Sequence, residues 1–281
     1  DVVNCTPTDF QKFPPRIVQR ITQNASRSWA LDINSIWPML CRDASAAVRA
    51  QPNRHTLIPS SHPMIVPGGR FRESYYWDTF WIMKGLLVSG MTDSACGVVL
   101  NLLEAVERFG FVPNGLRMYY LTRSQPPLLS EMVKDLLDSF ATNSSSTSSS
   151  SSSSYCGYGS EIGFLVRWLP VLDEEHMFWM TNRTVALQVP SHNNNNDDDD
   201  NDNSAVDILN VYNASTDIPR PESFAEDYAN AEVAGRTAQG QGKDVEAAKR
   251  AFYRGAASAA ETGFVVKMDN GDGDGEDDDQ C

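Results

Sequence analysis

The sequence contains no run of 18 consecutive apolar residues, and this absence excludes a membrane-spanning α-helix. It has only five cysteines, at spacings unlike those of a zinc site. Because an odd number of cysteines in a chain of 281 residues is not the framework of a small disulfide-rich domain, we expect isolated buried or free thiols. A basic segment followed by an apolar one is also missing after Asp1, so we expect either that a signal peptide has been removed or that the sequence is a fragment.

Basic residues are scarce relative to acidic ones. The chain has 23 Lys and Arg against 37 Asp and Glu, giving a formal net charge of −14, which argues against nucleic acid as a partner. Twelve of the acids lie in two clusters, within residues 197–202 and 269–279. Without them 25 acids face 23 bases, so the body of the chain is nearly neutral and its charge indicates little about a ligand.

Three stretches have too few apolar residues to bury a core. Residues 143–154 are mostly Ser, residues 193–203 are Asn and Asp, and residues 268–281 are largely Gly, Asp and Glu. We expect solvated insertions at the first two and an acidic disordered tail at the third. The tail lacks the ligand spacing of an EF-hand calcium loop, so the sequence predicts no metal site there.

Elsewhere apolar residues recur at helical spacing, and strand signals are scarce. The pattern predicts an all-α fold of antiparallel helix pairs, with the functional groups on the connections between helices. Pro170 interrupts one helical stretch and predicts a break there. The expected helices cover residues 77–88, 94–108, 126–140, 162–180, 223–231 and 244–260.

The connection that reads PGGRFRESYYWDTF, residues 67–80, mixes groups that bind sugars. Its two glycines permit backbone conformations that side chains resist, Arg70 supplies donors, Asp78 supplies acceptors and Trp77 offers a flat apolar face. Sugar rings present C–H faces to aromatic side chains, and hydroxyls to carboxylate, amide and guanidinium groups. The alternative is a folded loop held by an Arg–Glu pair, with the aromatic residues in the core.

Two further connections carry polar groups of the same kinds. In FVPNGLRMYYLTRSQPPL, Asn114 lies in a turn, and Arg123, Ser124 and Gln125 precede a helix start. Turn formation and helix capping are their alternative roles. In PRPES, two prolines fix the backbone around Arg220 and an Arg–Glu pair, whose alternative role is a surface salt bridge that contributes little stability.

Three segments follow one another in the chain in the order PGGRFRESYYWD, PNGLRMYYLTRSQPP and PRPES. They resemble the trehalase family of glycoside hydrolases, and the similarity extends over residues 14–263. The segments HMFWMTNRTVAL and VYNASTDIPRPESFAEDYANAE also resemble that family. The resemblance implies an (α/α)6 toroid with the sugar site in its central cavity. It also implies hydrolysis of α,α-trehalose to two glucoses with inversion, without a metal or cofactor. About half of the toroid is encoded, so we expect residues 1–267 to form a partial trehalase domain.

The resemblance further implies which residues contact the substrate, trehalose, because each of the family's motif positions up to this point carries a matching residue here. The three motifs and the glycine of a fourth supply the whole set. The expected contacts are Arg70, Trp77, Asp78, Asn114, Arg123, Ser124, Gln125, Arg220, Pro221, Glu222 and Gly263.

The resemblance fails at the catalytic acid. The family carries an ESGWDFSSRW-type motif where this chain reads AETGFVVK, and the family's Asp aligns with Val265, which can neither donate a proton nor carry charge. The family's catalytic base belongs to a part of the toroid beyond this sequence. An inverting glycosidase needs both groups, and each commonly contributes ~10²–10⁴-fold. We therefore expect the chain as given to lack nearly all turnover, and we do not expect Asp269 to replace the acid.

Three hypotheses remain at this stage. The chain is a trehalase-type glycosidase represented by an N-terminal fragment, a sugar-binding relative without catalysis, or a helical interaction scaffold. The three retained motifs argue against the scaffold. Glycosylation-type triplets favour a secreted protein, and they begin at Asn4, Asn24, Asn143, Asn182 and Asn213.

Overall fold

A computed structural model describes residues 1–144, 154–189 and 205–263. The described chain is mostly helical, as the sequence predicts, while the expected insertion at 193–203 and the tail at 268–281 lie outside it, as does all but the ends of the tract at 143–154. The α-helices are α1 (Pro15–Arg20), α2 (Asn24–Asn34), α3 (Trp37–Leu40), α4 (Ala46–Ala50), α5 (Tyr76–Val88), α6 (Thr92–Phe109), α7 (Leu129–Ser144), α8 (Glu161–Asn182), α9 (Phe224–Gly240) and α10 (Val245–Glu261).

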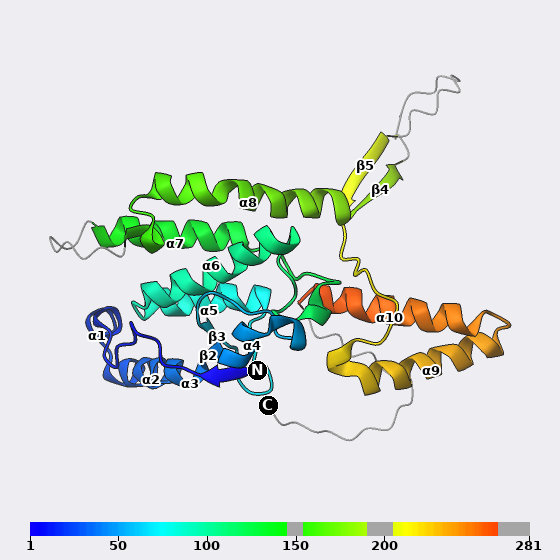
Figure 1. Ribbon diagram of the computed structural model, residues 1–281, viewed down its shortest axis with the longest axis horizontal. Coiled ribbons are helices and arrows are strands. Elements are labelled where there is room, and N and C mark those ends of the chain that lie inside the picture. The colour runs from blue at the N-terminus through cyan, green and yellow to red at the C-terminus, as the bar shows by residue number, and fades with distance from the viewer. Residues whose placement is uncertain (145–153, 190–204, 264–281) are drawn as a thin grey trace. The chain divides into compact units, whose positions relative to one another are not determined.

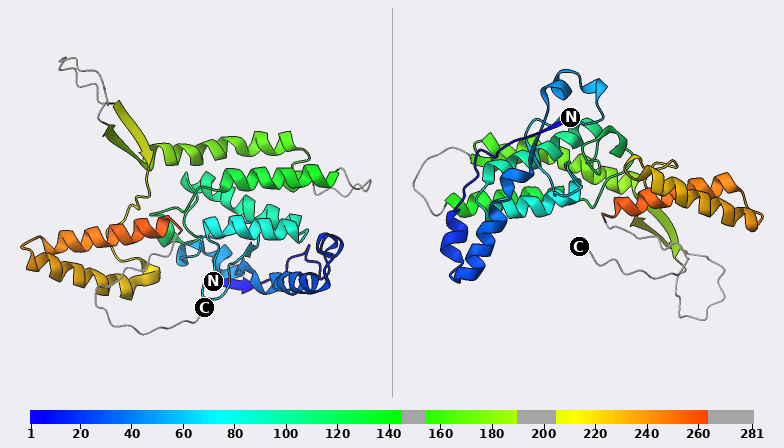
Figure 2. Two further views of the ribbon diagram at one scale, coloured as in Figure 1. Left: turned by 180° about the vertical axis from the view of Figure 1, so that it is seen from behind. Right: turned by 90° about the horizontal axis from the view of Figure 1, so that it is seen from below.

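The chain separates into two compact units, Asp1–Tyr212 and Asn213–Cys281. In the first, the N-terminal unit, α6 packs against α5, α7 and α8, and Figures 1 and 2 show these four helices side by side. Apolar side chains from all four helices form one core. Its fully buried members include Leu86, Leu103, Met132, Leu136 and Phe164.

Two small antiparallel sheets accompany the helices, although the sequence carries few strand signals. In the first, β2 (Cys41–Ala44) pairs with β1 (Val2–Asn4) and with β3 (Met64–Ile65). In the second, β4 (Thr184–Val189) pairs with β5 (Ala205–Asn210) in register from Thr184↔Asn210 to Val189↔Ala205. The Asn/Asp run predicted as an insertion therefore lies between the two strands of a hairpin.

The predicted helix break at Pro170 is wrong, because α8 continues through it from Glu161 to Asn182. Proline removes the N–H that would bond the carbonyl of Val166. Both residues lie on the exposed face of α8. Water can bond the freed carbonyl there, so the helix tolerates the proline.

The expectation of isolated thiols is also wrong for the described cysteines. Cys5 is joined to Cys41, and Cys96 is joined to Cys156, at sequence separations of 36 and 60. Cys281 lies outside the described residues. Disulfide partners this far apart in the sequence are not set by local spacing, which explains why the pattern alone did not indicate them.

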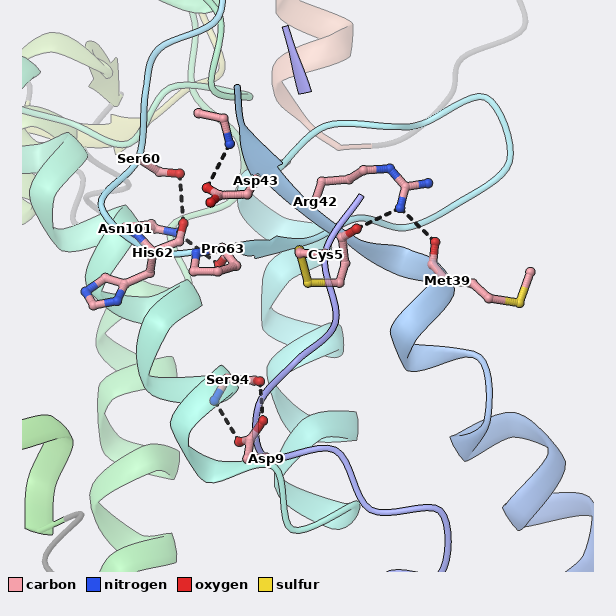
Figure 3. The surroundings of a disulfide bond; sticks show 12 residues. Cys5, Asp9, Met39, Arg42, Asp43, Ser60, His62, Pro63, Ser94 and Asn101 are labelled. Carbon is pink, nitrogen blue, oxygen red and sulfur yellow. Dashed lines mark hydrogen bonds between the residues drawn. A yellow bond between two sulfur atoms is a disulfide. The ribbon is translucent and has the colours of Figure 1, made fainter. Parts of the chain in front are cut away.

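Figure 3 shows the first disulfide and, beside it, the start of α6. The Asp9 carboxylate accepts hydrogen bonds from the backbone N–H of Ser94 (2.9 Å) and from its hydroxyl (2.5 Å). It thereby satisfies an N–H group in the first turn of α6, whose N-cap residue, Met91, supplies no side-chain bond. The N-terminal segment is thus tied to β2 by the disulfide and to the start of α6 by the Asp9 cap.

The second unit, the C-terminal unit, is described up to Gly263 and consists mainly of a hairpin of α9 and α10, which Figure 1 shows side by side. Helix α10 starts at its own N-cap, where the Asp244 carboxylate accepts from the N–H of Ala247 (3.0 Å). No helix among the described residues is both long enough and apolar enough to span a bilayer. Within the same residues, no cluster of His, Cys, Asp and Glu is arranged to hold a metal ion.

Candidate functional site

The first predicted contacts lie at the start of α5, which begins at Tyr76, six residues after Arg70 of the Gly-Gly-Arg turn. Its N-cap residue, Tyr75, makes no side-chain capping bond. Instead, the side chain of Gln125 accepts a hydrogen bond from the N–H of Trp77 (Oε1, 3.1 Å). Asp78 lies in the same first turn, half-buried, and burial raises the pKa of its carboxyl above the ordinary value.

The turn at Asn114 is joined to both neighbouring segments by its backbone and its side chain. The Tyr76 N–H donates to the Asn114 carbonyl (3.1 Å), and the Asn114 N–H donates to the Arg123 carbonyl (3.0 Å). The Arg123 guanidinium donates from Nε to Asn114 Oδ1 (2.7 Å) and lies over the Tyr120 ring. Asn114 and Arg123 are both buried, so Asn114 does more than form a turn.

Ser124 and Gln125 follow Arg123 into the same buried layer. Ser124 is fully buried and its hydroxyl donates to the Val112 carbonyl (2.6 Å). Helix capping is the alternative role for these residues, and the sequence predicts it at the start of the helix that follows them. Gln125 does cap a helix, but it caps α5, which lies 48 residues earlier in the chain.

Arg70 lies differently from the buried contacts. It is exposed, on a turn in which Gly68 and Gly69 both have positive φ (102° and 58°), as glycine permits. Its guanidinium lies 4.8 Å from the centre of the Phe71 ring. The Arg–Glu pair considered for this segment does form at Glu73, but its partner is Arg117 from the second connection.

In the C-terminal unit, Arg220 is held by an aspartate rather than by a glutamate. Its Nε and Nη2 donate to the two oxygens of Asp227 (2.8 and 2.6 Å), and its backbone N–H donates to the same carboxylate (2.9 Å). Asp227 is buried on α9, and its bonds raise the pKa of Arg220. Pro221 and Glu222 follow in a single 3₁₀ turn.

Gly263 follows Thr262, the C-cap residue of α10, in the C-terminal unit. Its φ is 77°, and its N–H donates to the Ala260 carbonyl (3.2 Å). Val265, the position predicted for the missing acid, lies outside the described residues.

The structure thus joins five of the predicted contacts in one hydrogen-bonded layer of the N-terminal unit: Trp77, Asn114, Arg123, Ser124 and Gln125. Asp78 adjoins this layer in sequence, and Arg70 lies apart on the exposed turn. Within the described C-terminal unit, Arg220 and Gly263 share no hydrogen bond.

Two hollows in the N-terminal unit do not coincide with this layer. One, of about 230 Å³, lies beside the Cys5–Cys41 disulfide and is bordered by His62, Asp93 and Ser94. Another, of about 190 Å³, borders α6 near Glu104 and Arg108. The described residues that line them include none of the predicted sugar contacts, so the hydrogen-bonded connections, and not these hollows, mark the candidate site.

A trehalase family model matches residues 1–277 of this chain. The chain belongs to the trehalase family. A probable trehalase of Oryza sativa subsp. japonica is 39% identical over 265 residues, which cover 94% of this chain and 40% of the rice protein. The trehalase of Pimpla hypochondriaca is 36% identical over 264 residues, 94% of this chain and 38% of its own. Human trehalase is 37% identical over 222 residues, which cover 79% of this chain and 32% of the human protein.

The chain therefore spans about 40% or less of the length of these trehalase-family relatives. A solved neutral trehalase from Saccharomyces cerevisiae aligns with 72% of this chain and 34% of its own, at 23% identity and a TM-score of 0.45. That likeness is too weak to carry an argument. Membership in the trehalase family rests on the sequence comparisons, and the closed (α/α)6 toroid stays a prediction.

Sequence reasoning missed three residues that hold the predicted contacts of this trehalase-family chain: Tyr76, Glu175 and Asp227. Tyr76 and Asp227 lie inside the resembling motifs, but neither is among the expected contacts, and Tyr76 is expected there only as a flat aromatic face. Glu175 carried a signal of its own, because it lies four residues before Trp179 and seven after Trp168, on the buried face of α8. A glutamate on an apolar helix face is rarely buried without a partner, and that rule would have found it.

Proposed function

We propose that this protein is a trehalase-type glycosidase whose described residues supply part of the site that binds α,α-trehalose. The observation that carries the proposal is the hydrogen-bonded layer at the start of α5. It fixes amide and guanidinium groups on the connection that precedes α7, and it holds the backbone of Trp77, whose indole offers a flat apolar face, in the first turn of α5. Family membership supplies the substrate, and the layer supplies groups suited to it.

The substrate contacts we propose are those implied by the motifs. Buried groups with fixed partners lose little conformational entropy when a ligand binds, so Asn114, Arg123 and Gln125 are suited to hold sugar hydroxyls in a defined orientation. Arg220 is fixed in the same sense by its two bonds to Asp227. The full proposed set comprises Arg70, Trp77, Asp78, Asn114, Arg123, Ser124, Gln125, Arg220, Pro221, Glu222 and Gly263.

Catalysis by inversion requires an acid to protonate the leaving oxygen and a base, ~6.5–9.5 Å away, to activate water. We propose that Val265 occupies the acid position, so that residues 1–281 bind trehalose but do not hydrolyse it. Valine has no proton to donate, and no neighbouring carboxyl is assigned to replace it. A sugar-binding relative without catalysis is therefore the second candidate function, and Val265 is the observation that favours it.

Calorimetric titration with trehalose tests the binding proposal, and proton NMR of released glucose tests catalysis. Arg70 and Arg72 form a matched pair, because both are exposed arginines on one turn and only Arg70 is a proposed contact. We expect Arg70→Ala to weaken trehalose affinity about tenfold, as the loss of a charged hydrogen bond does, and Arg72→Ala to leave it unchanged. Equal affinities of the two variants would remove Arg70 from the site, and glucose release by this chain would overturn the assignment of Val265.

A secreted location is a further part of the proposal. Two disulfides are typical of proteins that mature in an oxidising compartment, and the Asn-x-Ser/Thr triplets would be glycosylated there. A shift in mobility after treatment of the natural protein with an endoglycosidase would support this location. A natural protein whose cysteines all react with an alkylating reagent without prior reduction would contradict it.

A further inference from the structure

Helix α5 and the connection that leads into α7 exchange capping hydrogen bonds. The Trp77 N–H of α5 donates to the side chain of Gln125, which lies just before α7. In return, the N–H of Leu129, the first residue of α7, donates to the hydroxyl of Tyr76, the first residue of α5 (2.9 Å). The N-terminal N–H groups of a helix have no partner within the helix, so α7 depends on α5 for one of them and α5 depends on the connection that precedes α7.

The Tyr76 hydroxyl is the centre of this arrangement, and it has one proton to donate. It donates that proton to Glu175 Oε1 of α8, at 2.5 Å. With the proton directed to Glu175, the lone pairs of the hydroxyl are available to the Leu129 N–H. Glu175 therefore fixes which way the hydroxyl points, and it does so from a third helix, 99 residues along the chain from Tyr76.

Burying the carboxyl of Glu175 costs folding free energy. Glu175 is 3% exposed and Tyr76 is completely buried. Burial raises the pKa of Glu175 to about 7, while the bond from Tyr76 acts in the opposite direction. A leucine of similar size would fill the same space without that cost, so packing alone does not explain a carboxyl here. The presence of a carboxyl is explained by the acceptor oxygen that it offers to the Tyr76 hydroxyl.

We propose that Glu175 is a positioning residue for the sugar site: by holding the Tyr76 hydroxyl, it locks the start of α5 against the connection that precedes α7. The start of α5 carries Trp77 and Asp78, and that connection carries Gln125. Glu175 itself need not touch the sugar. This inference rests on the proposed trehalose site for its consequence, but the lock between the two helices is a property of the protein alone.

Hydrogen exchange and trehalose titration test the lock with three variants on α8. Glu175→Leu removes the acceptor and keeps the volume, Glu175→Gln keeps an acceptor oxygen, and Leu172→Ala creates a cavity one turn away without touching the lock. We expect Glu175→Leu to speed exchange at the Leu129 and Trp77 amides about tenfold and to weaken trehalose binding by a similar factor. Glu175→Gln should restore both, and Leu172→Ala should change neither by that amount.

Tyr76→Phe provides a second route, because it removes the hydroxyl and should speed exchange at Leu129 as Glu175→Leu does. The lock is overturned if Leu172→Ala speeds exchange at these two amides as much as Glu175→Leu, or if Glu175→Gln fails to restore them. If the unaltered protein binds no trehalose, the proposed function fails, and the exchange rates still decide whether Glu175 holds the two helices together. Trehalose binding that is unchanged in Glu175→Leu, with exchange accelerated, would show that the lock does not position the sugar site.

Discussion

Three helix starts in the N-terminal unit are satisfied differently from the start of α10 in the C-terminal unit. In the N-terminal unit, side chains from distant segments bind first-turn N–H groups: Gln125 for α5, Asp9 for α6 and Tyr76 for α7. In the C-terminal unit, α10 is capped by Asp244, the residue directly before it. The starts of α5, α6 and α7 therefore form only when the tertiary fold forms, whereas α10 carries its own start signal in Asp244, as α8 does in Ser160.

The predicted sugar contacts follow the same division. Trp77 and Gln125 are joined across 48 residues, and the lock behind them spans 99. Arg220 is joined to Asp227 across seven. Changes to the fold of the N-terminal unit should therefore disturb its contacts together, while the Arg220 contact should respond only to changes near α9.

Opening the disulfides should have the largest effect, and it should be confined to the N-terminal unit. All four bonded cysteines lie there, in loops of 36 and 60 residues. In the chain-entropy model each such loop contributes about 4 kcal/mol to the free energy of unfolding. Thermal unfolding with and without a reductant measures the loss. Amide exchange in α10 serves as the internal control, and an equal loss of protection in α10 and α6 would break the comparison.

The buried carboxyl of Glu175 should make the stability of the N-terminal unit depend on pH. Burial raises its pKa from 4.5 to about 7, so the folded chain binds this proton more tightly than the unfolded chain does. The resulting stability is fully present below pH 4.5 and is lost as the pH rises through about 7, amounting to about 3 kcal/mol. Urea unfolding at about pH 5 and about pH 8 measures it.

Glu175→Gln is the control for that experiment, because glutamine accepts from Tyr76 without titrating. The variant should show a smaller difference in stability between the two pH values. A difference as large as that of the unaltered protein would assign the pH dependence to other groups. Tyr76 is the titratable group bonded to Glu175, and its own pKa is raised further above its ordinary value, outside this range of pH.

The Arg220 contact should respond to a single nearby change. Asp227→Asn removes the charge from a buried carboxylate that accepts three hydrogen bonds from Arg220, and we expect the C-terminal unit to lose about 2 kcal/mol. Trehalose affinity should fall with it, and protection of α6 should not. Glu226→Gln, an exposed neighbour on the same helix, is the matched control. Equal effects of the two variants would show that net charge, and not the pair, matters.

The sequence predicted the helices much better than their caps. The stretches expected at 77–88 and 94–108 match α5 and α6 to within two residues, because apolar periodicity reports the buried face directly. The caps of these helices could not be read, because Tyr75 and Met91 are not capping residues and the groups that replace them lie far away in the chain. Local rules fail where a distant side chain supplies the bond.

The same reason limits what the sequence could say about the site. The motifs placed Asn114 and Gln125 in one family pattern, but their partners followed from the fold alone. The burial of Glu175 with a hydrogen-bond partner could have been predicted, since a glutamate on the apolar face of a helix such as α8 is rarely buried without one. The disulfides could not be predicted from the sequence, because no local pattern joins Cys96 to Cys156 across 60 residues. Long-range bonds thus account for most of what pattern reasoning missed.

The smallest expected effect compares two helices that are each capped by their own residue. Ser160 caps α8 in the N-terminal unit and Asp244 caps α10 in the C-terminal unit. Ser160→Ala should cost the first about 1 kcal/mol at any pH, because a hydroxyl does not titrate. The bond from Ala247 lowers the pKa of Asp244, so its cap is present above pH 3.8 and is lost as the pH falls further. Lowering the pH from about 8 to about 5 should therefore strengthen the surroundings of Glu175 on α8, and lowering it below 3.8 should weaken α10. Amide exchange of both helices over the two ranges would detect the opposite signs. Parallel trends in α8 and α10 would contradict the assignment of Glu175 and Asp244 as the groups that set the pH response of these helices.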